Sequence, residues 1–156
     1  MNRTASAHEL DHLRHILVRD LDALAKEVEA TPDEHLWKGT KGIHNSVGTL
    51  ALHLCGNLKH FIGHEIGGNG YKRDRDGEFS GQPMPRENLL AEISSAQDVI
   101  REVLSNLPAD RLDTPMSNPP PHHAGRTVRF FLIQLSCHLS RHTGQANYLR
   151  RILAGG

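Results

Sequence analysis

The feature that most constrains the fold is a repeat of apolar residues at three- and four-residue spacing over residues 6–30. The repeating positions are Leu10, Leu13, Leu17, Leu21, Leu24 and Val28. This spacing predicts one apolar face of an α-helix, which must be buried against other elements. Ser6 and Glu9 have the spacing of a capping box, so we expect the helix to begin there and to end at Thr31-Pro32.

Three further segments have the same helical periodicity. They lie at about residues 46–66, 85–107 and 127–154. Asn45 or Ser46 can cap the first of these, and Gly67-Gly68 can end it. Pro85 suits the first position of the next helix. Because no segment has a convincing strand pattern, the sequence predicts an all-α protein, a four-helix bundle.

The connection between the second and third helices, residues 67–84, is long for a link between helices. At about 3.3 Å per extended residue it can run back along a whole helix of about 30 Å. The second and third helices can then be parallel neighbours. We therefore expect an up-down-down-up bundle with a long crossover, formed by residues 1–156 as a single domain.

The charge balance excludes several classes of partner. Eighteen basic and eighteen acidic residues cancel, so we expect neither a nucleic acid nor a membrane surface as partner. No apolar run is long enough to cross a bilayer, and the N-terminal residues lack the apolar region of a secretory signal. Two cysteines, Cys55 and Cys137, are too few for a disulfide framework. We expect both to be buried, inert thiols in a cytoplasmic protein.

Histidine is over-represented, with 12 residues among 156. His138 and His142 form H-x-x-x-H, about 40° apart on the last helix and within its apolar face. Two unpaired imidazoles at a bundle seam would each carry a desolvation cost of a few kcal/mol. A shared metal ion would satisfy their nitrogens, but separate buried hydrogen-bond partners would also do so. The spacing alone leaves both interpretations open.

The first helix has a similar histidine stripe at His8, His12 and His15. This stripe lies opposite the leucine face, so we expect it to face water. Imidazoles in water need no partner from the protein. We therefore predict a surface role for these three residues.

The second helix has a polar flank formed by His53, Asn57, His60 and His64. The flank can be the solvated side of an amphipathic helix, or it can turn toward the last helix and supply a third ligand. Helical geometry does not choose among the three histidines. The loop histidines are expected at the surface or at a pocket rim; they are His35, His44, His122 and His123.

Three imidazoles on two helices would form a half-closed coordination site. Zinc in catalytic sites takes three protein ligands plus water, and nickel or iron also accept imidazole. The last helix has neither the HExxH motif of metalloproteases nor the Glu-x-x-His pair of di-iron bundles. The charged segment 71–79, with Arg73 and Glu78 among its charges, is expected to be a solvated or self-paired loop that braces the bundle end.

The chain resembles the DinB/YfiT-like superfamily of bacterial four-helix-bundle proteins. The resemblance rests on three segments: HNSVGTLALHLCGNLKHFI (44–62), YKRDRDGEF (71–79) and CHLSRHTGQANYLRR (137–151). It implies one divalent metal ion, zinc or nickel, held by His53, His138 and His142. The resemblance therefore selects His53 as the third ligand.

The resemblance also implies an activity. Some relatives use the metal in thiol-dependent transfer or isomerisation of a small-molecule substrate, with a low-molecular-weight thiol such as bacillithiol or mycothiol, and homodimers are common. The alternative is a non-catalytic metal-binding or stress-response module. Asn57 and His60 could line the same cavity as the metal. Gln145 lies within about 60° of both histidines of the last helix and could orient one of them.

Overall fold

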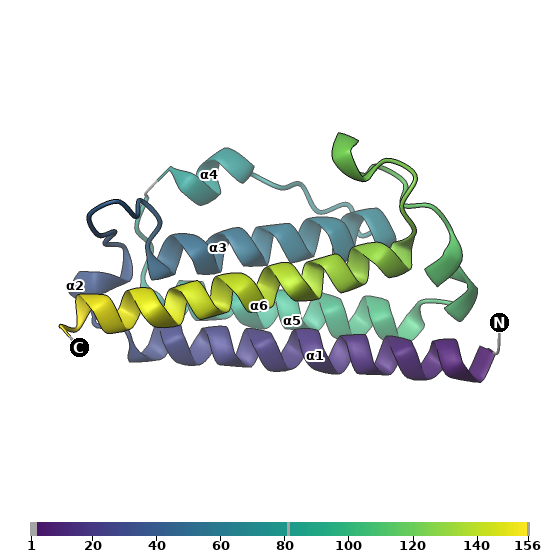
Figure 1. The fold of residues 1–156 in the computed structure, drawn as a ribbon, viewed down its shortest axis with the longest axis horizontal. Helices are drawn as coiled ribbons and strands as arrows, with labels where there is room; N and C mark the ends of the chain where they lie inside the picture. The colour runs from purple at the N-terminus through teal and green to yellow at the C-terminus, as the bar shows by residue number, and fades with distance from the viewer. Residues whose placement is uncertain (1–2, 81, 156) are drawn as a thin grey trace.

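The computed structural model describes residues 3–80 and 82–155, and it is an all-helical bundle (Figure 1). Its long helices are α1 (Arg3–Ala30), α3 (Val47–Leu58), α5 (Arg86–Asn106) and α6 (Val128–Leu153). A π-helix, η1 (Lys59–Ile66), continues α3 without a break. Within the described ranges, β pairing is limited to two isolated bridges. The prediction of an all-α bundle is confirmed.

Four short elements in the connections were not predicted. Two are α-helices, α2 (Asp33–Leu36) and α4 (Arg75–Phe79). The other two are 3-10 helices, η2 (Ala109–Asp113) and η3 (Pro121–His123). Helix α4 belongs to the crossover between α3 and α5, which runs back along the outer side of α3 (Figure 1). It brings the charged segment 71–79 onto the side of the bundle.

Contacts at both ends of α1 show that α6 runs parallel to it. Arg129, in the first turn of α6, pairs with Glu9 near the start of α1. Arg150, in the last turn of α6, pairs with Glu27 near the end of α1. Helix α5 runs the opposite way, because Arg86 at its start donates to the carbonyl of Val28 at the end of α1.

Helices α3 and α5 run in the same direction. Lys59 pairs with Glu92 in the first part of α5, and Gly67, at the end of η1, lies against Val103 further along. Together with the α1 contacts, this gives the up-down-down-up order that the length of the crossover indicated. The consequence for the site is that α3 and α6 are antiparallel neighbours.

Ser46 and Thr127 cap their helices at the predicted starts, whereas Pro85 and Ser6 do not have their predicted positions. Ser46 caps α3 by accepting a hydrogen bond from the Thr49 backbone N–H, and Thr127 caps α6 in the same way. Pro85 stands just before α5 rather than in its first position. The capping box predicted at Ser6 is wrong, since α1 begins at Arg3. Nothing between Arg3 and Ser6 breaks a helix, so the backbone continues through the predicted start.

The predicted leucine face of α1 is the centre of the core. Its six residues are at most 7% exposed, and each fully buried leucine contributes about 1.5–3 kcal/mol. His8, His12 and His15 are exposed on the opposite face, so that prediction is confirmed.

No helix within residues 3–80 and 82–155 combines the length and apolar character needed to cross a membrane.

The two cysteines have different surroundings. Cys55 is fully buried, and burial raises the pKa of its thiol to about 12. Cys137 is exposed, so the prediction that both thiols are buried is wrong for this residue. It precedes His138 by one position, which turns it about 100° away from the histidine face of α6 and toward solvent.

Candidate metal centre

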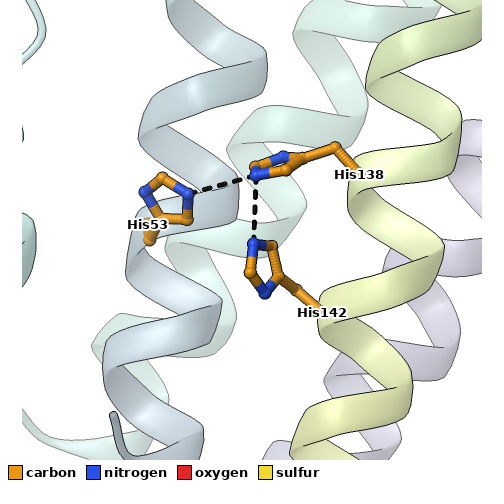
Figure 2. A group of neighbouring side chains, drawn as sticks. All are labelled: His53, His138 and His142. Carbon is orange, nitrogen blue, oxygen red and sulfur yellow. Dashed lines mark hydrogen bonds between the residues drawn. The ribbon is translucent and has the colours of Figure 1, made fainter. Parts of the chain in front are cut away.

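His53 from α3 and His138 and His142 from α6 point toward one another across the seam between these helices (Figure 2). Nε2 of His138 lies 3.4 Å from Nε2 of His53 and 3.0 Å from Nε2 of His142. One ligand atom from each of the three residues lies within 4.8 Å of the other two. The structure thus brings together the histidines that the sequence analysis selected.

Local sequence explains how the three side chains meet. The four-residue spacing of His138 and His142 stacks their imidazoles on consecutive turns of α6. Leu54 and Leu139, each next to one of the histidines, are fully buried in the shared hydrophobic core. The histidines themselves lie at the edge of the seam: the His53 side chain is 12% exposed and the other two are half-buried. They are therefore accessible from one side.

The spacing of the nitrogens fits a metal ion. A tetrahedral ion with metal–nitrogen bonds of about 2.05 Å holds its ligand nitrogens about 3.3 Å apart. Two of the three contacts, at 3.0 and 3.4 Å, bracket this value, and the ligand atoms of His53 and His142 lie within 4.8 Å of each other. Three imidazoles also leave a coordination position free for water or substrate, which is the ligand number of catalytic zinc sites.

Electrostatics favour the neutral, metal-binding form of the imidazoles. Burial, reinforced by the two neighbouring histidines, lowers the pKa of His138 to about 4. Burial also lowers the pKa of His53, although its hydrogen bond to Glu78 opposes this shift. Both rings are therefore neutral at pH 7 and present lone pairs. In the absence of a cation, hydrogen bonds between the rings are the alternative way to satisfy these nitrogens.

A carboxylate from the crossover completes the surroundings of His53, and sequence reasoning missed it. Oε2 of Glu78 lies 3.0 Å from Nδ1 of His53, and Arg73 binds both oxygens of the same carboxylate. The prediction that segment 71–79 is self-paired is confirmed by Arg73 and Glu78. The expectation of a solvated loop at the bundle end is wrong for these two residues, whose side chains are 11% and 6% exposed against α3.

The signal that could have revealed Glu78 is Gly56. This glycine stands in the middle of a helix, three residues after His53, where it costs about 1 kcal/mol relative to alanine. Such a glycine marks a close approach by another part of the chain. A Cβ at this position would lie 2.0 Å from Oε1 of Glu78.

The other predicted pocket residues have different positions. Oε1 of Gln145 lies 2.5 Å from Nδ1 of His142, the contact expected of an orienting partner. Asn57 is buried one turn beyond His53, and its Oδ1 has no hydrogen-bond partner among the described residues. His60 contacts His64 and lies 3.7 Å from Glu65. The roles of these residues at the metal stay predictions.

The expectation of a surface position is confirmed for His44 and His122, but not for His35 and His123, which are partly buried. His44 and His122 are exposed, while His35 is half-buried away from the three-histidine group. His123 packs on Phe130 and Phe131 at the start of α6. None of these four joins the candidate metal ligands among the residues that the structure places.

The sequence profile of the DinB superfamily matches residues 12–146. The chain belongs to the DinB superfamily. The match includes His53, His138 and His142, together with the crossover that supplies Glu78. No curated protein matches the chain. Among the residues that the structure describes in this DinB superfamily protein, the three-histidine group is a cluster of side chains that could hold a metal ion.

Proposed function

We propose that this DinB superfamily protein is a divalent-metal-dependent enzyme, a thiol-dependent transferase or isomerase that acts on a small molecule. The observation that carries the proposal is the convergence of three imidazole nitrogens from two helices. Three neutral nitrogen ligands suit zinc or nickel, and we expect one such ion per chain.

The residues of the chain would bind and orient the metal. Burial keeps His53 and His138 neutral, and the contacts with Glu78 and Gln145 orient two of the three rings. At this site His53, His138 and His142 would hold the divalent ion, which would supply a lowered pKa for a bound water or thiol near pH 7. The half-buried histidines leave one side of the site open to such a ligand.

The positions of the two cysteines favour a thiol supplied from outside the chain. Cys137 is exposed, but it turns about 100° away from the histidine face of α6. Cys55 is buried with a pKa of about 12, so it is neither accessible nor ionised near neutral pH. A thiolate is the reactive form in transfer chemistry. A low-molecular-weight thiol that binds at the metal would provide it.

The decisive experiment is elemental analysis of protein purified without a histidine tag, followed by cobalt substitution and titration with a small thiol. We expect one divalent ion per chain and a thiolate-to-cobalt charge-transfer band that grows to saturation. Absence of stoichiometric metal would overturn the proposal. A bound ion whose spectrum no thiol changes would instead favour the non-catalytic metal-binding or stress-response module.

We also propose a homodimer in the cytoplasm. Helix α6 exposes Ile133, Tyr148 and Ile152, an apolar surface that a second copy of the chain could cover. Both cysteines are free thiols, which suits a reducing compartment. Sedimentation velocity should give twice the chain mass, and a Tyr148→Glu variant should sediment as a monomer.

A further inference from the structure

We infer that Glu78 is a positioning residue that holds His53 in its metal-binding tautomer, and that Gly56 gives it access to the histidine. This inference rests on the proposed metal site. It adds that His53 binds the ion more tightly when the crossover packs against α3, so that metal affinity depends on residues that do not touch the ion.

The first argument is the anchoring of the Glu78 carboxylate. Arg73 donates from Nε to Oε1 at 2.6 Å and from Nη2 to Oε2 at 2.7 Å. This two-point contact sets the plane of the carboxylate, as paired arginine–carboxylate contacts generally do. The Glu78 side chain is 6% exposed, so water competes little for its oxygens. Oε2 is thereby held 3.0 Å from Nδ1 of His53.

The second argument is that the carboxylate selects the tautomer. An ionised carboxylate only accepts hydrogen bonds, so Nδ1 of His53 must carry the proton. Nε2 then has a free lone pair, and it is Nε2 that faces His138. In the opposite tautomer Nδ1 could accept from Arg73 Nη2, 3.2 Å away, but its lone pair would face the carboxylate oxygen. Repulsion between these two acceptors disfavours that form.

The third argument is the shape of the α3 surface. At Gly56 a Cβ would lie 2.0 Å from Oε1 and 2.8 Å from Cδ of Glu78. Any larger residue would therefore displace the carboxylate that contacts His53. An interior glycine destabilises α3, but its missing side chain leaves room for the Glu78 carboxylate to lie against the helix.

Two further contacts stabilise the crossover near His53. Asp74 caps α4 by accepting a hydrogen bond from the Gly77 backbone N–H at 2.9 Å. The Phe79 ring packs on the His53 imidazole with centroids 4.9 Å apart. The charge run in segment 71–79 thus has a structural role: two of its charges form the pair that faces the histidine, and the rest face solvent.

The experiment compares Glu78→Gln with Asp76→Asn, which removes the same charge from an exposed position of α4. Metal affinity is measured by chelator competition, and the His53 tautomer is measured by nitrogen-15 NMR in the metal-free protein. We expect Glu78→Gln to weaken metal binding roughly 10- to 100-fold and to populate both His53 tautomers, because an amide can donate as well as accept. Asp76→Asn should match the parent protein in both measurements.

A second pair of variants changes no charge and tests whether Gly56 gives the Glu78 carboxylate access to His53. Gly56→Ala should reproduce the loss of affinity, whereas Gly144→Ala, in open space on α6 two residues after His142, should not. The double variant Glu78→Gln with Arg73→Gln leaves no unpaired charge. It should melt cooperatively and still bind metal weakly, which would exclude unfolding as the cause.

The two proposals fail differently. If the parent protein binds metal, and Glu78→Gln binds it equally well with a single Nδ1-protonated tautomer, the inference about Glu78 is overturned and the metal site stands. If the parent protein binds no metal, the proposed function is overturned. In that case the tautomer measurement on the metal-free protein still decides whether Glu78 positions His53.

Discussion

Two groups of three histidines in this chain have similar sequence patterns and opposite surroundings. His8, His12 and His15 follow helical spacing on α1, and all three are exposed. His138 and His142 follow the same kind of spacing on α6, but they face a third histidine from α3 across a packed seam (Figure 2). Histidines at helical spacing therefore form a candidate metal site only when a second helix packs beside them and supplies another ligand.

The physical reason is solvation. Water satisfies the nitrogens of an exposed imidazole, so the α1 stripe needs no partner from the protein. At the α3–α6 seam water is partly excluded and three Nε2 atoms crowd together, which leaves lone pairs that a cation would stabilise. Four measurements test this contrast between the two groups, and their expected effects decrease from the first to the last.

The largest effect is expected from removal of one candidate ligand. His142→Ala should weaken metal binding by more than the roughly 100-fold loss seen when only an outer partner is removed. His15→Ala, which makes the same change in the α1 stripe, should bind metal like the parent protein. Chelator competition on tag-free protein measures both. Equal losses in the two variants would erase the distinction between the groups.

The next effect is stabilisation by metal. At a free metal concentration of about 100 times Kd, binding should stabilise the fold by about 2.7 kcal/mol, which corresponds to roughly 5–10 °C in Tm for a chain of this size. Thermal denaturation with and without zinc measures the shift. His53→Ala should abolish it, and a variant with alanine at all three α1 positions should retain it. Loss of the zinc-induced Tm shift in the α1 variant would mean that the metal binds to the α1 histidines and not to His53, His138 and His142.

The next effect is expected in the pH dependence of the metal-free protein, and solvent screening reduces it because His138 is only half-buried. The pKa of His138 is about 4 in the folded state against 6.5 ordinarily, so the unfolded chain binds more protons between these values. Stability should therefore fall as pH drops from 6.5 to about 4, with no further contribution from this group below or above that window. The lowered pKa of His53 acts in the same direction.

Urea denaturation across that pH window measures the slope. His138→Gln should flatten the dependence, whereas His12→Gln, at an exposed position of α1, should leave it unchanged. An unchanged slope in His138→Gln would mean that this imidazole is not held neutral by its surroundings.

The smallest effect is expected at Gln145. Its Oε1 orients His142 through Nδ1, but the residue is exposed, so water can replace the contact. Gln145→Ala should weaken metal binding by at most about 10-fold, which is less than Glu78→Gln. Isothermal titration with zinc measures the two variants side by side. A larger loss at Gln145 than at Glu78 would reverse our ranking of buried and exposed partners.

Local sequence specifies the four long helices and the histidine pair of α6. Apolar periodicity and capping residues act over a few positions, which is why α3 and α6 begin where Ser46 and Thr127 indicated. His138 and His142 share one helix, so their proximity follows from helical geometry alone. Even the local prediction was incomplete, because α1 begins at Arg3 and not at the capping box.

The third histidine depended on more than the pattern. Periodicity left His53, His60 and His64 as equal candidates, and the family resemblance selected His53. The tertiary structure agrees because the rotation of α3 about its axis turns His53 toward α6. The same rotation leaves His60 beside His64 and Glu65. That rotation results from packing of the whole core, which no short window of sequence specifies.

The surroundings of the site depend on the tertiary structure. Glu78 lies 25 positions after His53 in the chain, and its contact depends on the path of the crossover over Gly56. Charge and spacing within segment 71–79 indicate self-pairing but not the helix on which the pair is placed. Local interactions set the elements, whereas the docking of a long connection is chosen by long-range contacts that the folded core creates.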